Sequence, residues 1–345
     1  MTKKPQSKVT IRDVADFVGV HHSTVSRALS RDKNKKISAA VRLKIERAAE
    51  KLGYFPNLAA SSLKRNRSFA IGILIPDLTN PVFPPIIRGI QNCVEALGFT
   101  VIIANTDDEK EKELQALRMM QERSIEGLII ATARREDPTV DECIKRDIPF
   151  VLVNRSVDRA DVNAVVLDED FAIRTTLDHL FDLGHKRIAH IAGPADTSTG
   201  FERARAFRSH MRSNILDPGL IVTADKFTVE EGKRAFRKLA ERGDDFTAVV
   251  AGSDLIALGC IDMMTETGIR VPQDVSIVGG NDIPFLSRMN PSLTSIAIPK
   301  YEMGNQGARA LMAMLDGERE EPLVVRMQPR LVIRNSTARV KDEAG

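Results

Sequence analysis

Cysteine is scarce in this chain, whose 345 residues include only Cys93, Cys143 and Cys260. Their number is odd, they lie far apart, and no CxxC pair occurs, so neither a disulfide framework nor a zinc site is indicated. We therefore expect buried free thiols, and no metal or other cofactor.

Long apolar runs are also missing. No run approaches the ~20 residues of a membrane-spanning helix, and the first residues, MTKKPQSK, lack the apolar segment of a signal peptide. Hydrophobic residues make up 43% of the chain and charged residues 28%, as in an ordinary soluble protein. We expect a cytoplasmic protein with room for two or three domains.

Three enzyme motifs are absent, namely GxSxG, GxxxxGK and a GxGxxG between a strand and a helix. His179, His185 and His190 are close in sequence, but a predicted helix, turn and strand separate them. We expect these histidines to be structural. The sequence predicts no catalytic residue, no metal ligand and no enzymatic activity.

Charge is distributed unevenly along the chain. Residues 1–67 carry 16 Lys and Arg against five Asp and Glu, a net charge of +11, and the remaining residues carry 34 against 42, a net charge of −8. A basic head suits a polyanion, because each neutralised phosphate releases counterions. The acidic body is repelled by the same polymer, so we expect nucleic-acid contact to be confined to the head.

Residues 10–29, TIRDVADFVGVHHSTVSRAL, predict two short helices that meet at Gly19. Thr10 and Asp13 are spaced as a capping box at the start of the first helix. Its apolar residues recur at helical spacing and form one buried stripe. That stripe consists of Ile11, Val14, Ala15 and Val18.

The second helix places Val25 and Leu29 inward, one turn apart, and leaves polar side chains near its N-terminus on the outer face. Those outer residues are His22, Ser23, Ser26 and Arg27. This layout is typical of a helix-turn-helix, whose second helix enters the major groove of DNA. A helical hairpin in a larger bundle is the alternative, and the coinciding basic charge favours DNA.

A third helix is predicted from Ser38, as N-cap, to Leu52, followed by Gly53 as C-cap. Its stripe is Val41, Ile45, Ala48 and Leu52. Residues 56–67, PNLAASSLKRNR, are small, polar and basic, and composition alone favours a linker.

From Phe69 onward, buried apolar runs alternate with helical patterns, which predicts βαβ units and parallel sheets. The runs are AIGILIP, TVIIANT, EGLIIAT, PFVLVN, AVVLD, RIAHIAG, TAVVAGS, VSIVGGN and TSIAI, and the helical patterns include 85–97, 110–122, 171–183, 202–211 and 255–267. There are too many strands for one comfortable sheet. We expect an α/β body of two doubly wound lobes, with a cleft near the carboxyl ends of the strands.

An ordered series of motifs over nearly the whole chain resembles the lactose repressor (LacI) family of bacterial transcriptional regulators, which includes the purine repressor type. The motifs are TIRDVA, STVSRAL, AAEKLGYFPN, AASSLK, IGILIPDLTNPVF, EGLII, LGHKRIAHIAGP, GFERARAF, GSDLIALG, RVPQDVSIVGGND and PRLVIRNST. The resemblance implies a homodimer on a palindromic operator. It also implies a periplasmic-binding-protein-like core with a small molecule between the lobes.

The resemblance also implies domain boundaries. A helix-turn-helix domain is expected at 1–55, a hinge helix at 56–67 and an effector-binding, dimer-forming core at 68–345. Crossings between lobes near 168, 297 and 327 place the N-lobe at about 68–168 and 298–326, and the C-lobe at about 169–297 and 327–340.

On DNA, the family's base-reading positions fall on His22, Ser23 and Arg27, and Arg27 can donate two bonds to guanine. Thr10, Thr24 and Ser26 are expected to touch phosphate or to support the helix. His21 stands where the family often has a Ser or Thr cap, so either it caps weakly or the helix begins one residue off.

The hinge of the family matches residues 58–64. Leu63 corresponds to the leucine inserted in the minor groove, Ala60 to a small contact residue and Lys64 to a phosphate partner. Ser61 departs from the arginine or glutamine of many members, which removes one potential contact. So short and polar a hinge is expected to fold only on DNA.

The effector positions of the family map onto both lobes. In the first lobe and on its crossover side they are Asn80, Val82, Phe83, Asn154 and Arg155, and in the second lobe Thr197, Thr199, Arg203, Phe227, Ser253 and Asn281. The aromatic rings suit stacking on a ring, and the polar groups suit hydroxyls or a carboxylate.

Arg203 is the strongest of these candidates, because an arginine in a cleft needs an acceptor. Asn281 replaces the aspartate of many sugar-binding members, so a sugar is possible but not required. Gly280 stands where an aromatic residue is common and leaves extra space.

A solute-binding receptor with the same two-lobed core is the rival to a regulator, but it needs an export signal and no basic head. We expect a ligand-responsive repressor with a sugar or sugar derivative as effector. Induction and corepression both remain open.

Overall fold

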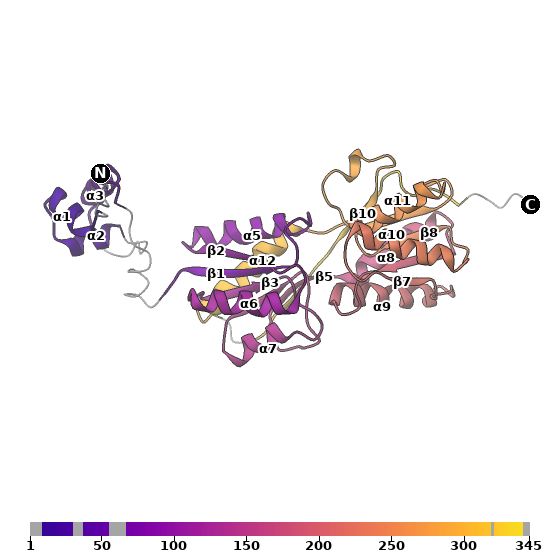
Figure 1. Cartoon of the computed structure of the whole chain (residues 1–345), viewed down its shortest axis with the longest axis horizontal. Helices are drawn as coiled ribbons and strands as arrows, with labels where there is room; N and C mark the ends of the chain where they lie inside the picture. The colour runs from indigo at the N-terminus through magenta and orange to yellow at the C-terminus, as the bar shows by residue number, and fades with distance from the viewer. Residues whose placement is uncertain (1–8, 30–36, 55–66, 319–320, 341–345) are drawn as a thin grey trace, which may run out of the picture. The chain divides into compact units, whose positions relative to one another are not determined.

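The structure is a computed structural model that describes residues 9–29, 37–54, 67–318 and 321–340. The chain divides into two compact units, Met1–Phe69 and Ala70–Gly345, which we call the head and the core (Figure 1). In these ranges, no helix is both long enough and apolar enough to cross a membrane.

The head contains the helices α1 (Ile11–Val18), α2 (His22–Ala28) and α3 (Ala39–Leu52). The predicted capping box starts α1: the Thr10 backbone N–H donates to the Asp13 carboxylate at 2.6 Å, and the Asp13 N–H donates to the Thr10 hydroxyl. Gly19 and Gly53 end α1 and α3 at φ values of 75° and 66°, in the left-handed region that glycine adopts at little cost.

The three helices share one small apolar core. Val14, Val25 and Ile45, one from each helix, are fully buried, and Leu29 packs against them as a partly buried residue. His21 caps α2, because its Nδ1 accepts a hydrogen bond from the Ser23 backbone N–H at 3.3 Å. The helix therefore begins at His22, and the predicted helix-turn-helix is confirmed.

The first sheet of the core defines the N-lobe, with the strand order β11-β5-β4-β3-β1-β2 and parallel pairing throughout. Its strands are β1 (Ala70–Ile75), β2 (Thr100–Asn105), β3 (Gly127–Ile130), β4 (Phe150–Val153), β5 (Ala164–Leu167) and β11 (Val324–Met327). Its helices are α5 (Phe83–Ala96), α6 (Lys110–Glu122), α7 (Pro138–Lys145) and α12 (Lys300–Leu315).

The second sheet defines the C-lobe, with the order β12-β10-β9-β8-β6-β7, parallel except for the antiparallel pair β10–β12. Its strands are β6 (Ile188–Ala192), β7 (Ile221–Thr223), β8 (Ala248–Ala251), β9 (Ser276–Asn281), β10 (Thr294–Ala297) and β12 (Arg330–Val332). Its helices are α8 (Glu169–Asp182), α9 (Ser198–Ser213), α10 (Val229–Glu241), α11 (Asp254–Glu266) and the 3₁₀ helix η1 (Leu286–Arg288).

The chain passes between the lobes three times, after β5, after β10 and after β11 (Figure 1). Each of the nine predicted apolar runs forms a strand, and the predicted fold of two parallel-sheet lobes is confirmed. The sequence did not predict β7, β11 and β12. These strands are short, stand at sheet edges and have mostly exposed or half-buried residues, so they carry no continuous apolar run.

Buried thiols were expected at all three cysteines. Cys143 and Cys260 are fully buried, and burial raises the pKa of the Cys143 thiol to about 12. Cys93 departs from the expectation, because it is partly exposed on α5.

Glycine allows two pairs of helices to approach closely, one pair in each lobe. In the N-lobe, α5 and α12 meet at Gly89 and Gly304, and a Cβ at either position would collide with a backbone carbonyl of the other helix. In the C-lobe, Gly232 of α10 and Gly259 of α11 have the same relation. A side chain at any of these positions must therefore push two helices apart.

We predict that Gly304→Ala lowers the free energy of unfolding by about 3 kcal/mol, because the added methyl overpacks a backbone contact that cannot yield. Gly280→Ala is the control, because a Cβ there has no neighbour closer than 3.8 Å, and we expect a loss below about 1 kcal/mol. Urea unfolding of both variants provides the measurement. Equal losses would show that the α5–α12 contact is not rigid.

Candidate functional sites: the outer face of α2 and an interlobe cavity

The outer face of α2 carries the side chains predicted to read DNA. His22, Ser26 and Arg27 are exposed and Ser23 and Thr24 are half-buried, whereas Val25 and Ala28 are buried on the opposite side. An exposed polar face at the start of the second helix is the arrangement that helix-turn-helix proteins place in the major groove.

Local hydrogen bonds orient two of these side chains. Arg27 Nε donates to the Ser23 carbonyl one turn earlier, at 3.3 Å, and the Ser23 hydroxyl lies 2.8 Å from His21 Nδ1. Thr10, the N-cap of α1, is exposed, but its hydroxyl donates to the Asp13 carboxylate in the capping box. The predicted hinge contacts Ala60, Leu63 and Lys64 lie outside the described residues.

A cavity of about 30 Å³ lies between the two lobes of the core, and we call it the interlobe cavity. Nine of the eleven predicted effector residues line it: Asn80, Val82, Phe83, Asn154, Arg155, Thr199, Arg203, Phe227 and Asn281. An adjoining pocket of about 240 Å³ shares Asn80, Arg155 and Phe227 with it. Together the two spaces approach the ~300 Å³ at which small-molecule pockets begin.

The N-lobe wall comes from the turn before α5 and from the end of β4. The Asn80 side-chain oxygen accepts a hydrogen bond from the Val82 N–H at 3.1 Å, which fixes the turn. Phe83, the first residue of α5, is only 3% exposed. Asn154 follows β4 at a φ of 71°, a conformation that asparagine tolerates better than most residues.

The C-lobe wall comes from α9, from the segment before α10 and from the end of β9. Asn281 has a φ of 114°, and its carbonyl accepts a hydrogen bond from Lys300 Nζ, which also donates to the Asp282 carbonyl at 2.9 Å. A Cβ at Gly280 would lie 3.8 Å from the Arg203 guanidinium, in ordinary van der Waals contact. The carboxylate of buried Asp254 accepts from the Ile283 N–H at 2.9 Å and supports the same turn.

Arg203 finds its acceptor inside the protein. Its Nε and Nη2 donate to the two oxygens of Glu169, at 2.6 and 2.9 Å, and its Nη1 donates to the Gly252 carbonyl. Arg203 and Glu169 are 8% and 7% exposed, so this is a buried bidentate ion pair. The sequence argument that this arginine needs an acceptor is therefore satisfied by Glu169, without a ligand carboxylate.

Arg155 also has a carboxylate partner in its own lobe, through one nitrogen. Its Nη1 donates to the Asp108 carboxylate at 2.9 Å and to the Thr132 carbonyl at 3.2 Å, and Arg155 is 3% exposed. Its guanidinium carbon lies 5.8 Å from the centre of the Phe227 ring, which belongs to the other lobe. Both cavity arginines thus have their charge balanced by a carboxylate of the protein.

Thr197 and Ser253, which were predicted to contact the effector, cap helices and do not line the cavity. The Thr197 hydroxyl accepts from the Gly200 N–H and donates to the Pro194 carbonyl, at 3.1 and 2.8 Å. The Ser253 hydroxyl accepts from the Ile256 N–H at 3.2 Å. Both residues are 2% exposed, so their hydroxyls hold the starts of α9 and α11.

His179, His185 and His190, all in the C-lobe, make structural contacts. His190 Nδ1 lies 2.8 Å from the Val250 carbonyl, and burial lowers the pKa of His190 to about 4. His185 contacts Thr247 through Nδ1, and His179 contacts Thr337 through Nε2. Each histidine therefore joins segments of one lobe.

Comparison with known proteins agrees with this geometry. Residues 10–57 match the family model described as bacterial regulatory proteins, lacI family, and residues 177–337 match a periplasmic binding protein-like domain. The chain is 32% identical to the HTH-type transcriptional repressor CytR of Escherichia coli, over 97% of this chain and 98% of that protein. It is 31% identical to the ribose operon repressor of Halalkalibacterium halodurans, over 95% and 97%.

Solved structures give the same result. The lac repressor dimer bound to operator and the anti-inducer ONPF has a TM-score of 0.85 and 26% identity, with 96% of this chain and 100% of that chain covered. The complex of the transcriptional regulator CelR with cellobiose has a TM-score of 0.73 and 28% identity, with 95% and 100% covered. Both parts of the molecule are matched over almost their whole length, and the chain belongs to the lacI family of bacterial regulatory proteins.

Proposed function

We propose that this transcriptional regulator is a homodimeric repressor that binds a palindromic operator through α2 and the hinge, and that a neutral, hydroxyl-bearing ring compound in the interlobe cavity controls it. The observation that carries the proposal is the cavity itself, whose walls come from both lobes. A ligand that touches both walls binds one lobe arrangement more tightly than another, and so shifts the population between them.

On the DNA side, we assign base reading to His22, Ser23 and Arg27. Support comes from their place on the outer face of α2 and from the +11 charge of residues 1–67. Thr10, Thr24 and Ser26 contact phosphate or support the helix in this proposal. Of the hinge residues, Leu63 inserts in the minor groove, Ala60 is a small contact residue and Lys64 contacts phosphate, as the family resemblance implies.

On the effector side, we assign contacts to the nine lining residues, with Thr197 and Ser253 as supports behind them. Asn80, Asn154 and Asn281 offer amides that can both donate to and accept from hydroxyls. Phe227 offers a ring face. Because Arg155 and Arg203 already carry carboxylate partners, an anionic effector would have to displace Asp108 or Glu169, and a neutral one would not.

Related proteins support this class of effector. The CelR structure is a complex with cellobiose, and a LacI family regulator from Enterococcus faecium, with a TM-score of 0.70 and 28% identity, has bound ribose. The relatives named above are regulators, and we propose that this chain likewise has no enzymatic activity and acts in the cytoplasm, where its operator lies.

The first test concerns base reading. We predict that Arg27→Lys relaxes the preference at one base pair of each half-site by about tenfold or more, because lysine cannot donate the bidentate pair that arginine gives guanine. His22→Asn should change the preferred base at another position. Binding-site selection from random duplexes by the full chain gives both results.

Arg47→Lys is the matched control, since it makes the same exchange at an exposed position of α3. It should select the wild-type half-site. If Arg27→Lys and His22→Asn also select the wild-type half-site with undiminished preference, α2 does not read bases.

The second test concerns the effector. We predict that Asn281→Gly weakens effector binding about tenfold, because it removes the amide that bonds hydroxyls. Stability without effector should be unchanged or higher, because glycine relieves the φ of 114°. Thermal shift of the full chain with pentoses, hexoses, disaccharides, sugar acids and nucleosides identifies the effector, and titration of the variant measures the loss.

Ile215→Gly is the control, because Ile215 also has a positive φ, 58°, but is 95% exposed and does not line the cavity. It should bind the effector as the wild type does. Wild-type affinity in Asn281→Gly would remove Asn281 from the site, and a preference for sugar acids would contradict the neutral effector.

A further inference from the structure

Four contacts beside the interlobe cavity join the N-lobe to the start of α9 and the residues just before it. Arg134 Nε lies 3.2 Å from the Asp196 carboxylate, Arg135 lies over the Phe201 ring at 3.7 Å, and the Ser156 N–H donates to the Ser198 hydroxyl at 2.8 Å. The Arg135 N–H also donates to the Asp196 carbonyl at 2.8 Å. We call this set the interlobe clasp; its residues are Arg134, Arg135, Ser156, Asp196, Ser198 and Phe201.

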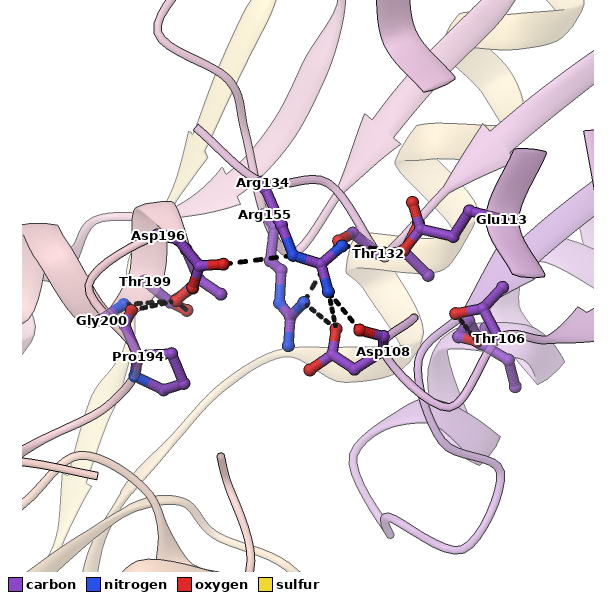
Figure 2. A network of polar contacts seen from close by, with 12 residues as sticks. Thr106, Asp108, Glu113, Thr132, Arg134, Arg155, Pro194, Asp196, Thr199 and Gly200 are labelled. Atoms are coloured by element: carbon purple, nitrogen blue, oxygen red, sulfur yellow. Dashed lines mark hydrogen bonds and ion pairs between the residues drawn. The ribbon is translucent and has the colours of Figure 1, made fainter. Parts of the chain in front are cut away.

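Arg134 connects the clasp to the cavity wall through Asp108 (Figure 2). The Asp108 carboxylate oxygen that accepts from Arg155 at 2.9 Å also lies 3.5 Å from Arg134 Nη2. Arg134 donates to the Asp108 carbonyl as well, and its Nη1 lies 3.3 Å from the carboxylate of Glu113. The Arg134 guanidinium therefore contacts both Asp196 of the C-lobe and Asp108, the carboxylate that pairs with the cavity residue Arg155.

The N-lobe side of this network is firmly fixed. Glu113 is 1% and Arg134 7% exposed, and the Asp137 carboxylate accepts from the Arg134 N–H at 2.9 Å. Burial, with the nearby charge of Asp137, raises the pKa of Glu113 to about 7. Arg134 is therefore held by buried N-lobe groups on one side, and its Nε reaches Asp196 of the other lobe.

The C-lobe side of the clasp is the same helix end that builds the cavity. Asp196 comes just before the N-cap of α9, and Ser198 and Phe201 are interleaved with the cavity residues Thr199 and Arg203 on its first turns. A change in the distance between Arg134 and Asp196 therefore moves Thr199 and Arg203 relative to Arg155 and Asn154 on the opposite wall.

We propose that Arg134 and Asp196 are positioning residues of the effector site, whose ion pair holds the start of α9 against the N-lobe and so assembles the cavity in this lobe arrangement. The part of this proposal that concerns the effector and operator rests on the proposed function. The part that concerns how the ion pair holds the two lobes together does not rest on the proposed function, and it can be measured without any ligand.

Two backbone amides report directly on the clasp, because the N–H groups of Arg135 and Ser156 donate across the lobes. Asp196→Lys places a cation beside Arg134, and the side chain of Asp196 is 60% exposed, so folding should be retained. We expect both amides of the full-length variant to exchange hydrogen at least about fivefold faster than in the wild type, because separation of the lobes frees both together. Asp196→Asn should also speed the exchange of both amides, by a smaller factor of about two to five.

Asp161→Lys is the matched control. Asp161 is also an exposed aspartate paired with an arginine, Arg159, but both lie in one N-lobe loop. It should leave the two amides at wild-type rates. Wild-type rates in Asp196→Lys, or faster exchange at Arg135 alone, would overturn the proposal, because the pair would then not hold the lobes.

Operator affinity separates this proposal from the function on which it rests. On the duplex selected by the wild type, Asp196→Lys should change the dissociation constant at least about threefold in either direction, and Asp161→Lys should not. An unchanged constant would overturn the coupling of the clasp to function. If the wild type selects no duplex, the proposed function fails, and the exchange experiment still decides whether the pair holds the lobes.

Discussion

The interlobe region depends on the pairing of buried guanidinium groups with carboxylates. An unpaired charge in such a place costs several kcal/mol, and removal of one partner from a buried pair typically costs about 3–5 kcal/mol. Glu169 therefore does two things: it allows Arg203 to lie against the cavity, and it removes most of the attraction that Arg203 would have for an anion. Asp108 has the same effect on Arg155.

The two sheets make these pairs possible because they fix the ends of strands that are distant in sequence. Glu169 begins α8 just after the first crossing, and Arg203 is on α9, so their contact exists only because both helices lie on one lobe. Close helix packing at Gly89 and Gly304 fixes α12, whose first residue, Lys300, reaches the carbonyl of Asn281 in the other lobe. A rigid N-lobe thereby helps to set a strained residue of the C-lobe wall.

The sequence predicted most of the elements, and the family resemblance supplied most of the cavity lining, but neither indicated the contacts that support them. Helical spacing and capping residues were sufficient for α1, α2 and α3, and continuous apolar runs for nine strands. The edge strand β7 has no such run, so periodicity could not reveal it. Glu169 and Asp108 are 34 and 47 residues from their arginines, and no local pattern indicates a partner at that separation. Thr197 was expected to line the cavity, but its hydroxyl caps α9. Both roles require a hydroxyl, so the residue type alone does not distinguish them.

Allosteric response needs a contact whose energy differs between lobe arrangements, and a partly exposed ion pair between lobes meets that need. A fully buried pair such as Arg203–Glu169 lies within one lobe and persists when the lobes move, so it defines the wall without sensing the movement. Asp196 is accessible to water, so its separation from Arg134 costs about 1 kcal/mol or less, at the lower end of the ~1–3 kcal/mol of typical coupling between two ligands. The clasp is therefore weak enough to be broken by an effector and strong enough to change the population of the two arrangements.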